Sequence, residues 1–200
     1  MFDDVARARL TPVLLPVARW LGRQGVTPSH VTLGALAVAL TAAALAGAGW
    51  RWSALVCWLA SRVGDGLDGV LARDTGRTSA WGGYLDITCD MAAYSAMVVA
   101  FGVLRPDLHL LWSAILMGYV LAITTTLALA GAAERAGRTI SHTNRTFQFT
   151  TGLAEAGETT IVYVVCLAVP AVVEPVAWLW CIVLGLSVIQ RSVLAWRALR

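Results

Sequence analysis

Residues 65–90 of the chain read DGLDGVLARDTGRTSAWGGYLDITCD and contain five aspartates, four of which stand at regular spacings: Asp65, Asp68, Asp86 and Asp90. Asp65 and Asp68 are spaced i, i+3, and Asp86 and Asp90 are spaced i, i+4, so each pair lies on one face of a helix. Long apolar segments flank the stretch on both sides. A carboxylate inside a membrane costs about 2.5–3.5 kcal/mol on insertion scales, so four together require a functional reason. The stretch predicts a divalent-metal site that handles phosphate, built on two consecutive transmembrane helices.

The composition places the chain among integral membrane proteins. Of its 200 residues 58% are hydrophobic, and the mean hydropathy is +0.70, far above that of a soluble domain. This length accommodates a single domain, residues 1–200. All 15 basic residues are arginine, and a net charge of +3 is too small to indicate a nucleic-acid partner. The four cysteines lie in apolar segments without a C-x-x-C pair, which predicts packing residues.

We expect an all-α integral membrane protein in which residues 28–200 form a six-transmembrane helix bundle. Six apolar segments reach the length of about 20 residues that a bilayer requires. They lie near residues 29–49, 53–73, 80–103, 108–132, 153–173 and 176–196. Pro106 is expected to break the third connection, and Pro170 and Pro175 flank the fifth. Residues 1–27 are expected to form an uncleaved amphipathic helix at the membrane interface, since their apolar run is short and no cleavage site follows it.

The arginines predict the orientation of the bundle. With the amino terminus inside, thirteen arginines fall on the inner side, and only Arg51 and Arg105 fall on the outer side. Both termini and the active site are therefore expected on the cytoplasmic side of a bacterial cytoplasmic membrane. Asp65 would lie about 12 Å in from Arg73 at 1.5 Å per residue, a depth that a water-soluble substrate reaches through a polar cavity.

The motif resembles the signature of the CDP-alcohol phosphotransferase family, also called the CDP-alcohol phosphatidyltransferase family. The eight signature positions correspond to Asp65, Asp68, Gly69, Ala72, Arg73, Gly82, Asp86 and Asp90. The six-span topology and Thr27-Pro28 before the first span are also similar to that family, although Ser29 stands where many members carry Asn. The resemblance covers most of the chain in topology and residues 65–90 in detail.

The resemblance implies a metal-dependent enzyme in which a hydroxyl attacks the β-phosphorus of a CDP-linked alcohol and CMP leaves. Two Mg²⁺ or Mn²⁺ ions would be held by Asp65, Asp68 and Asp86, and Asp90 would be close enough to share in the coordination. Asp90 would also be the general base that takes the proton of the acceptor. Members of the family are homodimers, so a homodimer is expected.

The resemblance also implies which residues bind the nucleotide and its diphosphate. These residues are Asp65, Asp68, Gly69, Ala72, Arg73 and Gly82. The small residues on the aspartate faces would let the nucleotide approach the helix backbone. The planar guanidinium of Arg73 would bind the diphosphate, unless it serves only as a positive charge at the inner membrane surface.

The expected reaction transfers a phosphatidyl group from CDP-diacylglycerol to an alcohol during phospholipid biosynthesis, in contact with membrane lipids. One alternative is transfer from a soluble CDP-alcohol to a lipid alcohol. A second is a membrane prenyltransferase, although the aspartates of those enzymes are spaced differently. A third is a divalent-cation transporter, which neither a broken-helix pair nor an inverted repeat supports.

Charged residues outside the motif admit two interpretations each. Arg62 is either a counter-ion of the aspartates or a residue whose charged end reaches the inner interface. The long polar connection and the start of the fifth span form either a solvated surface or a pocket for the acceptor or a lipid phosphate. The residues concerned are Arg135, Arg138, Arg145, Glu155 and Glu158. No basic residue occurs between Asp90 and Arg105, which favours an acceptor without a phosphate.

Overall fold

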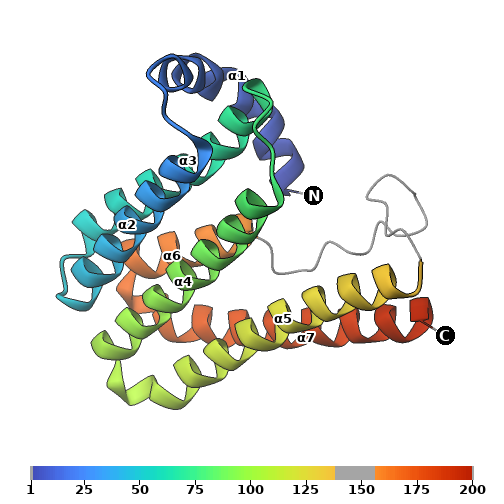
Figure 1. Cartoon of the computed structure of the whole chain (residues 1–200). Coiled ribbons are helices and arrows are strands. Elements are labelled where there is room, and N and C mark those ends of the chain that lie inside the picture. The colour runs from blue at the N-terminus through green and yellow to red at the C-terminus, as the bar shows by residue number, and fades with distance from the viewer. Residues whose placement is uncertain (1, 138–155, 200) are drawn as a thin grey trace.

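The computed structural model describes residues 2–137 and 156–199, and all regular elements of this part of the chain are helices. Its α-helices are α1 (Phe2–Arg23), α2 (Pro28–Gly47), α3 (Arg51–Asp74), α4 (Ala80–Leu104), α5 (His109–Arg135), α6 (Ala156–Ala168) and α7 (Val173–Leu199), arranged as in Figure 1. Short 3-10 turns, η1 (Pro106–Leu108) and η3 (Pro170–Val172), precede α5 and α7. Each turn begins with a proline, whose missing N–H is not needed at that position. The predicted break at Pro106 is confirmed. Pro170 begins the turn before α7, as expected, whereas Pro175 lies within the first turn of α7 and does not bound the connection.

Within residues 2–137 and 156–199, four elements are long and apolar enough to cross a membrane, so the chain is a multi-pass helical membrane protein. They are α2, α4, α5 with its preceding turn, and α7 with its preceding turn. These four confirm four of the six predicted spans. Helix α3 has sufficient length, but it contains six charged residues: Arg51, Arg62, Asp65, Asp68, Arg73 and Asp74. Helix α6 is apolar and has 13 residues in the described part, and the segment before it lies outside that part.

The helices form two groups that meet at α6 and also where α4 contacts α5. Helix α2 packs along both α3 and α4, whereas α5 packs along α7, and α6 contacts both α3 and α7 (Figure 1). Small residues allow the first group to pack closely: a side chain at Gly64 of α3 would begin only 3.1 Å from the Cβ of Ala35 on α2. This close packing brings a polar residue of α2 to the aspartates of α3.

The core at the meeting point is aromatic and hydrogen-bonded. Trp58 and Tyr163 are fully buried, with ring centroids 5.2 Å apart. The Tyr163 hydroxyl donates to the Tyr94 carbonyl at 3.0 Å, and the Trp180 indole donates to the Tyr119 hydroxyl at 2.8 Å. Buried hydroxyls that are satisfied in this way hold α4, α5, α6 and α7 in a unique arrangement.

Helix α1 packs against α3 and exposes its opposite face. Leu14 and Ala18 contact a small cluster of α3 residues, and the Arg19 Nε lies 3.2 Å from a carboxylate oxygen of Asp74. Exposed apolar side chains, including those of Val13 and Trp20, line the other face. Such a face suits a helix at a membrane interface, which stays a prediction for α1.

Candidate active site

A tight turn between α3 and α4 brings the motif aspartates to one region. Gly76 follows α3 with a φ of 65°, a conformation that glycine adopts without strain. The Arg77 N–H then donates to the Ala72 carbonyl at 2.9 Å and closes the end of the helix. Ser79 caps α4, since its hydroxyl accepts the Gly82 N–H at 3.0 Å. The chain therefore reverses over a few residues, and the motif segments of both helices face one another.

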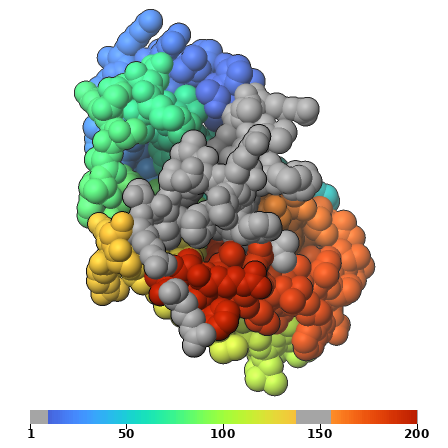
Figure 2. Space-filling model, turned by 90° about the vertical axis from the view of Figure 1, so that its right-hand side faces the viewer, coloured from blue at the N-terminus to red at the C-terminus, as the bar shows by residue number. Residues whose placement is uncertain are grey.

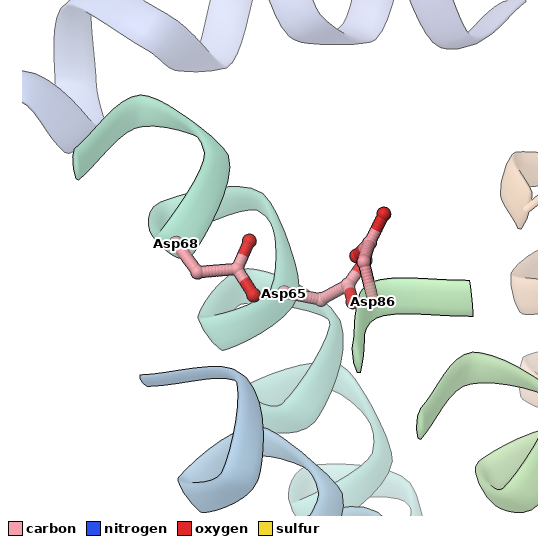
Figure 3. Close-up of side chains that lie close together, drawn as sticks. All are labelled: Asp65, Asp68 and Asp86. Carbon is pink, nitrogen blue, oxygen red and sulfur yellow. The ribbon is translucent and has the colours of Figure 1, made fainter. Parts of the chain in front are cut away.

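Three aspartates form one acidic group between the two helices. Carboxylate oxygens of Asp65, Asp68 and Asp86 lie within 4.8 Å of one another, and Figure 3 shows Asp65 and Asp68 on α3 facing Asp86 on α4. Asp68 is buried, Asp65 is half-buried and Asp86 is exposed. Carboxylate oxygens in this arrangement are the ligands that Mg²⁺ and Mn²⁺ prefer, so the group could hold a divalent cation.

The most buried of these carboxylates is held by a residue that the motif does not contain. The Thr32 hydroxyl of α2 donates a hydrogen bond to Oδ2 of Asp68, and Thr32 is only 5% exposed. The same hydroxyl lies 3.1 Å from the Pro28 carbonyl. Sequence analysis missed Thr32; the signal available was a hydroxyl placed one helical turn after Pro28 in a largely apolar segment.

Asp90 lies outside the group of three and has its own cation. The Arg62 Nη1 is 2.7 Å from Asp90 Oδ1, and the Tyr94 hydroxyl donates to Asp90 Oδ2 at 3.3 Å. Arg62 also lies 4.0 Å from a carboxylate oxygen of Asp65. Of the two interpretations of Arg62, the structure supports the counter-ion, and its closest partner among the aspartates is Asp90.

A cavity of about 600 Å³ contains this site. All eight motif positions line it, together with residues from α1, α2 and the start of α6. Gly69 leaves room for Arg73, because a Cβ at position 69 would begin 3.3 Å from the Arg73 guanidinium. Figure 2 shows the surface hollowed beside the green part of the chain. The cavity therefore offers carboxylates, a guanidinium and small residues to one ligand.

The residues predicted to bind the acceptor are only partly described. Arg135 is exposed at the end of α5, where its Nε donates to the Gly131 carbonyl at 3.0 Å, and it does not line the cavity. Glu158 is half-buried in the first turn of α6, next to Gly157, which does line the cavity. Three of the predicted residues lie outside the described part: Arg138, Arg145 and Glu155.

Comparison with known proteins identifies the family. The model of the CDP-alcohol phosphatidyltransferase family matches residues 25–189. The chain is 33% identical over 175 residues to the inner membrane protein YnjF of Escherichia coli, a match that covers 86% of this chain and 84% of that protein. It is 40% identical over 108 residues to a phosphatidylinositol phosphate synthase of Streptomyces avermitilis, which covers 50% of this chain and 42% of the synthase.

A solved structure has the same fold. The crystal structure of Mycobacterium tuberculosis phosphatidylinositol phosphate synthase with CDP-DAG bound matches with a TM-score of 0.70 and 22% sequence identity. The match covers 92% of this chain and 94% of that one.

Proposed function

Because the chain belongs to the CDP-alcohol phosphatidyltransferase family, we propose that it transfers a phosphatidyl group from CDP-diacylglycerol to an acceptor alcohol and releases CMP. The observation that supports this function best is the group of three carboxylates within 4.8 Å, in a cavity lined by every motif position. The related synthase with bound CDP-DAG supports a lipid donor. Because the family consists of transferases of this kind, the prenyltransferase and transporter alternatives are set aside.

The metal ligands in this proposal are Asp65, Asp68 and Asp86. Their donor set fits Mg²⁺ or Mn²⁺, because it consists only of carboxylate oxygens that converge from two helices. When bound, a pair of these ions would neutralise the diphosphate and stabilise the leaving CMP. A share of Asp90 in the coordination has less support, since both of its oxygens face Arg62 or Tyr94.

The remaining motif residues bind the donor and move the proton. Arg73 would bind the diphosphate beside Gly69, and Ala72 and Gly82 would leave space for the nucleotide. The acceptor oxygen attacks the β-phosphorus and forms a new P–O bond. The bond from that phosphorus to the CMP oxygen breaks, and CMP leaves with the electron pair. Asp90 accepts the proton of the attacking hydroxyl as general base.

The topology in this proposal has six spans, with α1 on the membrane surface. Helix α3 would be the second span, and its charged residues would face the cavity instead of lipid. Helix α6 would be part of the fifth span. The excess of arginines on one side supports cytoplasmic termini and a cytoplasmic active site. We also propose a homodimer, which light-scattering mass measurement in mild detergent tests directly; a monomer at all concentrations contradicts it.

The acceptor in this proposal is an alcohol without a phosphate. A second phosphate would need its own cation, and the chain has no basic residue between Asp90 and Arg105. The start of α6 lines the cavity, so Glu158 would lie near the acceptor, where a carboxylate suits hydroxyls or an ammonium group better than a phosphate. Glu155 lies outside the described residues and stays a prediction from the sequence. Arg77 also lines the cavity and is the residue to test if a phosphorylated acceptor is used.

One assay tests the donor and the acceptor together. Purified protein in lipid vesicles is incubated with Mg²⁺, labelled CDP-diacylglycerol and a panel of alcohols that includes inositol phosphate and glycerol 3-phosphate. The expected result is CMP release with a new lipid that contains the unphosphorylated alcohol. Turnover only with phosphorylated alcohols contradicts the proposed acceptor, and loss of that turnover in Arg77→Gln would identify the cation. A parallel reaction with a soluble CDP-alcohol and diacylglycerol tests the alternative donor.

A further inference from the structure

Arg62 is a buried cation that the family motif does not include. Its side chain is only 11% exposed. The Nη1 nitrogen lies 2.7 Å from Asp90 Oδ1, 3.3 Å from the Tyr94 hydroxyl and 4.0 Å from Asp65 Oδ2. Arg62 comes from α3 and Asp90 from α4, so this ion pair joins the two helices that form the cavity.

Aromatic rings fix the orientation of this guanidinium. Its central carbon lies 4.7 Å from the ring centroid of Trp58 and 5.3 Å from that of Tyr94. Trp58 is fully buried and Tyr94 is 3% exposed, and both rings pack against Tyr163 in the aromatic core. A guanidinium placed between rigid rings has little freedom to turn, and it is drawn toward their faces. Arg62 therefore presents its N–H groups to Asp90 in a fixed direction.

We propose that Arg62 is a positioning residue that holds Asp90 as the general base and keeps it out of the metal-binding group of Asp65, Asp68 and Asp86. This inference rests on the proposed function. Asp65 and Asp90 line the same cavity, but the Arg62 Nη1 lies 2.7 Å from Asp90 Oδ1 and 4.0 Å from Asp65 Oδ2. The pairing gives one aspartate of the motif a task different from that of the other three.

The geometry leaves Asp90 able to accept a proton. Arg62 contacts one carboxylate oxygen and Tyr94 contacts the other, each through one donor. A carboxylate has about four lone-pair positions, so both oxygens keep acceptor capacity for the hydroxyl of the substrate. Arg62 would thus fix the orientation of the base without blocking it.

The test compares Arg62→Gln, Arg62→Lys and Tyr94→Phe with the wild type. Arg62→Gln should lower kcat for CMP release about 100-fold, a typical contribution of a general base, and should change the KM for CDP-diacylglycerol less than about threefold. Arg62→Lys keeps the charge and should recover about tenfold of that loss, and Tyr94→Phe, which keeps the ring, should lose less than about tenfold. Arg51→Gln is the matched control, since Arg51 begins the same helix and stacks on Trp52 outside the cavity.

Two further measurements separate positioning from a general structural role. Because Arg62 would act through Asp90, adding Arg62→Gln to Asp90→Asn should lower the remaining kcat less than about threefold. Direct Mn²⁺ binding, followed by electron paramagnetic resonance without substrate, should become at least about threefold tighter in Arg62→Gln, because the released Asp90 adds a negative charge beside the group. In the Arg62→Gln, Asp90→Asn double variant this gain should disappear.

Four results overturn the inference. Two concern Arg62→Gln: a higher KM with unchanged kcat, and Mn²⁺ binding that is unchanged or weaker. The other two are multiplicative losses of kcat in the Arg62→Gln, Asp90→Asn double variant and full activity in Arg62→Lys. If Arg62→Gln does not fold, Arg62→Lys decides the question. Its kcat should be below that of the wild type, and its Mn²⁺ affinity should stay within about twofold of the wild-type affinity. If the wild type releases no CMP from any CDP-linked donor, the proposed function fails. The Mn²⁺ measurements require no turnover and still test whether Arg62 keeps Asp90 away from the metal.

Discussion

Replacing Thr32 with valine removes one hydroxyl from a buried carboxylate and preserves the shape of the side chain. The hydroxyl donates to Oδ2 of Asp68, and both residues are almost fully buried, at 5% and 7% exposure. Water therefore has little access to replace the lost donor. Asp68 would lose the hydrogen bond that orients its carboxylate toward the acidic group.

The expected size of the effect follows from this geometry. A hydrogen bond to a charged group contributes about 1.5–3 kcal/mol, which corresponds to about 10- to 150-fold in an equilibrium constant. Residues that orient metal ligands typically change metal affinity or activity by about 10- to 100-fold when removed. We therefore expect Thr32→Val to raise the Mg²⁺ concentration for half-maximal CMP release at least about tenfold.

The assay is a Mg²⁺ titration of CMP release from CDP-diacylglycerol, with two matched controls. Thr32→Ser keeps the hydroxyl and should stay within about threefold of the wild type. Thr41→Val removes a hydroxyl from the same helix that bonds only to its own backbone, at 2.9 Å from the Ala37 carbonyl, and should behave as the wild type. A wild-type Mg²⁺ dependence in Thr32→Val would refute the reasoning, since the bond to Asp68 would then contribute nothing to the site.

Three further predictions concern the site and the bundle. Asn substitutions at Asp65, Asp68 or Asp86 should each lower CMP release by about 100-fold or more, whereas Asp74→Asn, at the end of α3, should not; near-normal release in the first set would show that the metal assignment is wrong. Asp90→Asn should abolish turnover and preserve binding of the CDP-lipid, and equal loss of both would make Asp90 a metal ligand instead of a base. Gly118→Val should destabilise the packing of α5 on α7 by about 1–3 kcal/mol, because a Cβ there begins 3.2 Å from Leu184, whereas Gly185→Val has open space; equal thermal unfolding temperatures in detergent would contradict this.

The features predicted correctly from the sequence depend on short-range geometry. The spacing of Asp65 and Asp68 is enough to place them on one face of a helix. Pro106 and Pro170 are likewise enough to predict where the chain leaves one helix before the next begins. The predicted spans at 53–73 and 80–103 already imply a reversal between α3 and α4, and the structure shows that it depends on Gly76 and Ser79, a few residues apart. Such features need no knowledge of which helices pack together.

The features that sequence analysis missed or left open depend on contacts between helices. Thr32 reaches Asp68 from 36 positions away, and this contact depends on the close packing of α2 on α3. Arg62 is close in sequence to Asp65, but its nearest carboxylate oxygen belongs to Asp90, 28 positions away on α4. Arg135 could be placed near the site only by knowing the direction of α5, and the structure places its side chain outside the cavity lining. Spacing along one helix does not contain this information.

The four aspartates are one residue type in four different settings, and the settings predict different tasks. Asp68 is buried against a hydroxyl and is oriented before any ligand arrives, whereas Asp86 is exposed on the other helix. Asp65 is half-buried, and its carboxylate lies 4.0 Å from the Arg62 Nη1. Asp90 forms the closer ion pair with that cation, at 2.7 Å. A divalent cation would therefore join a pre-oriented part of the site on α3 to an exposed part on α4, where substrate can also reach. Separating the base from the metal group would require only one cation in the aromatic core, which is why Arg62 is the residue outside the motif whose replacement should be most informative.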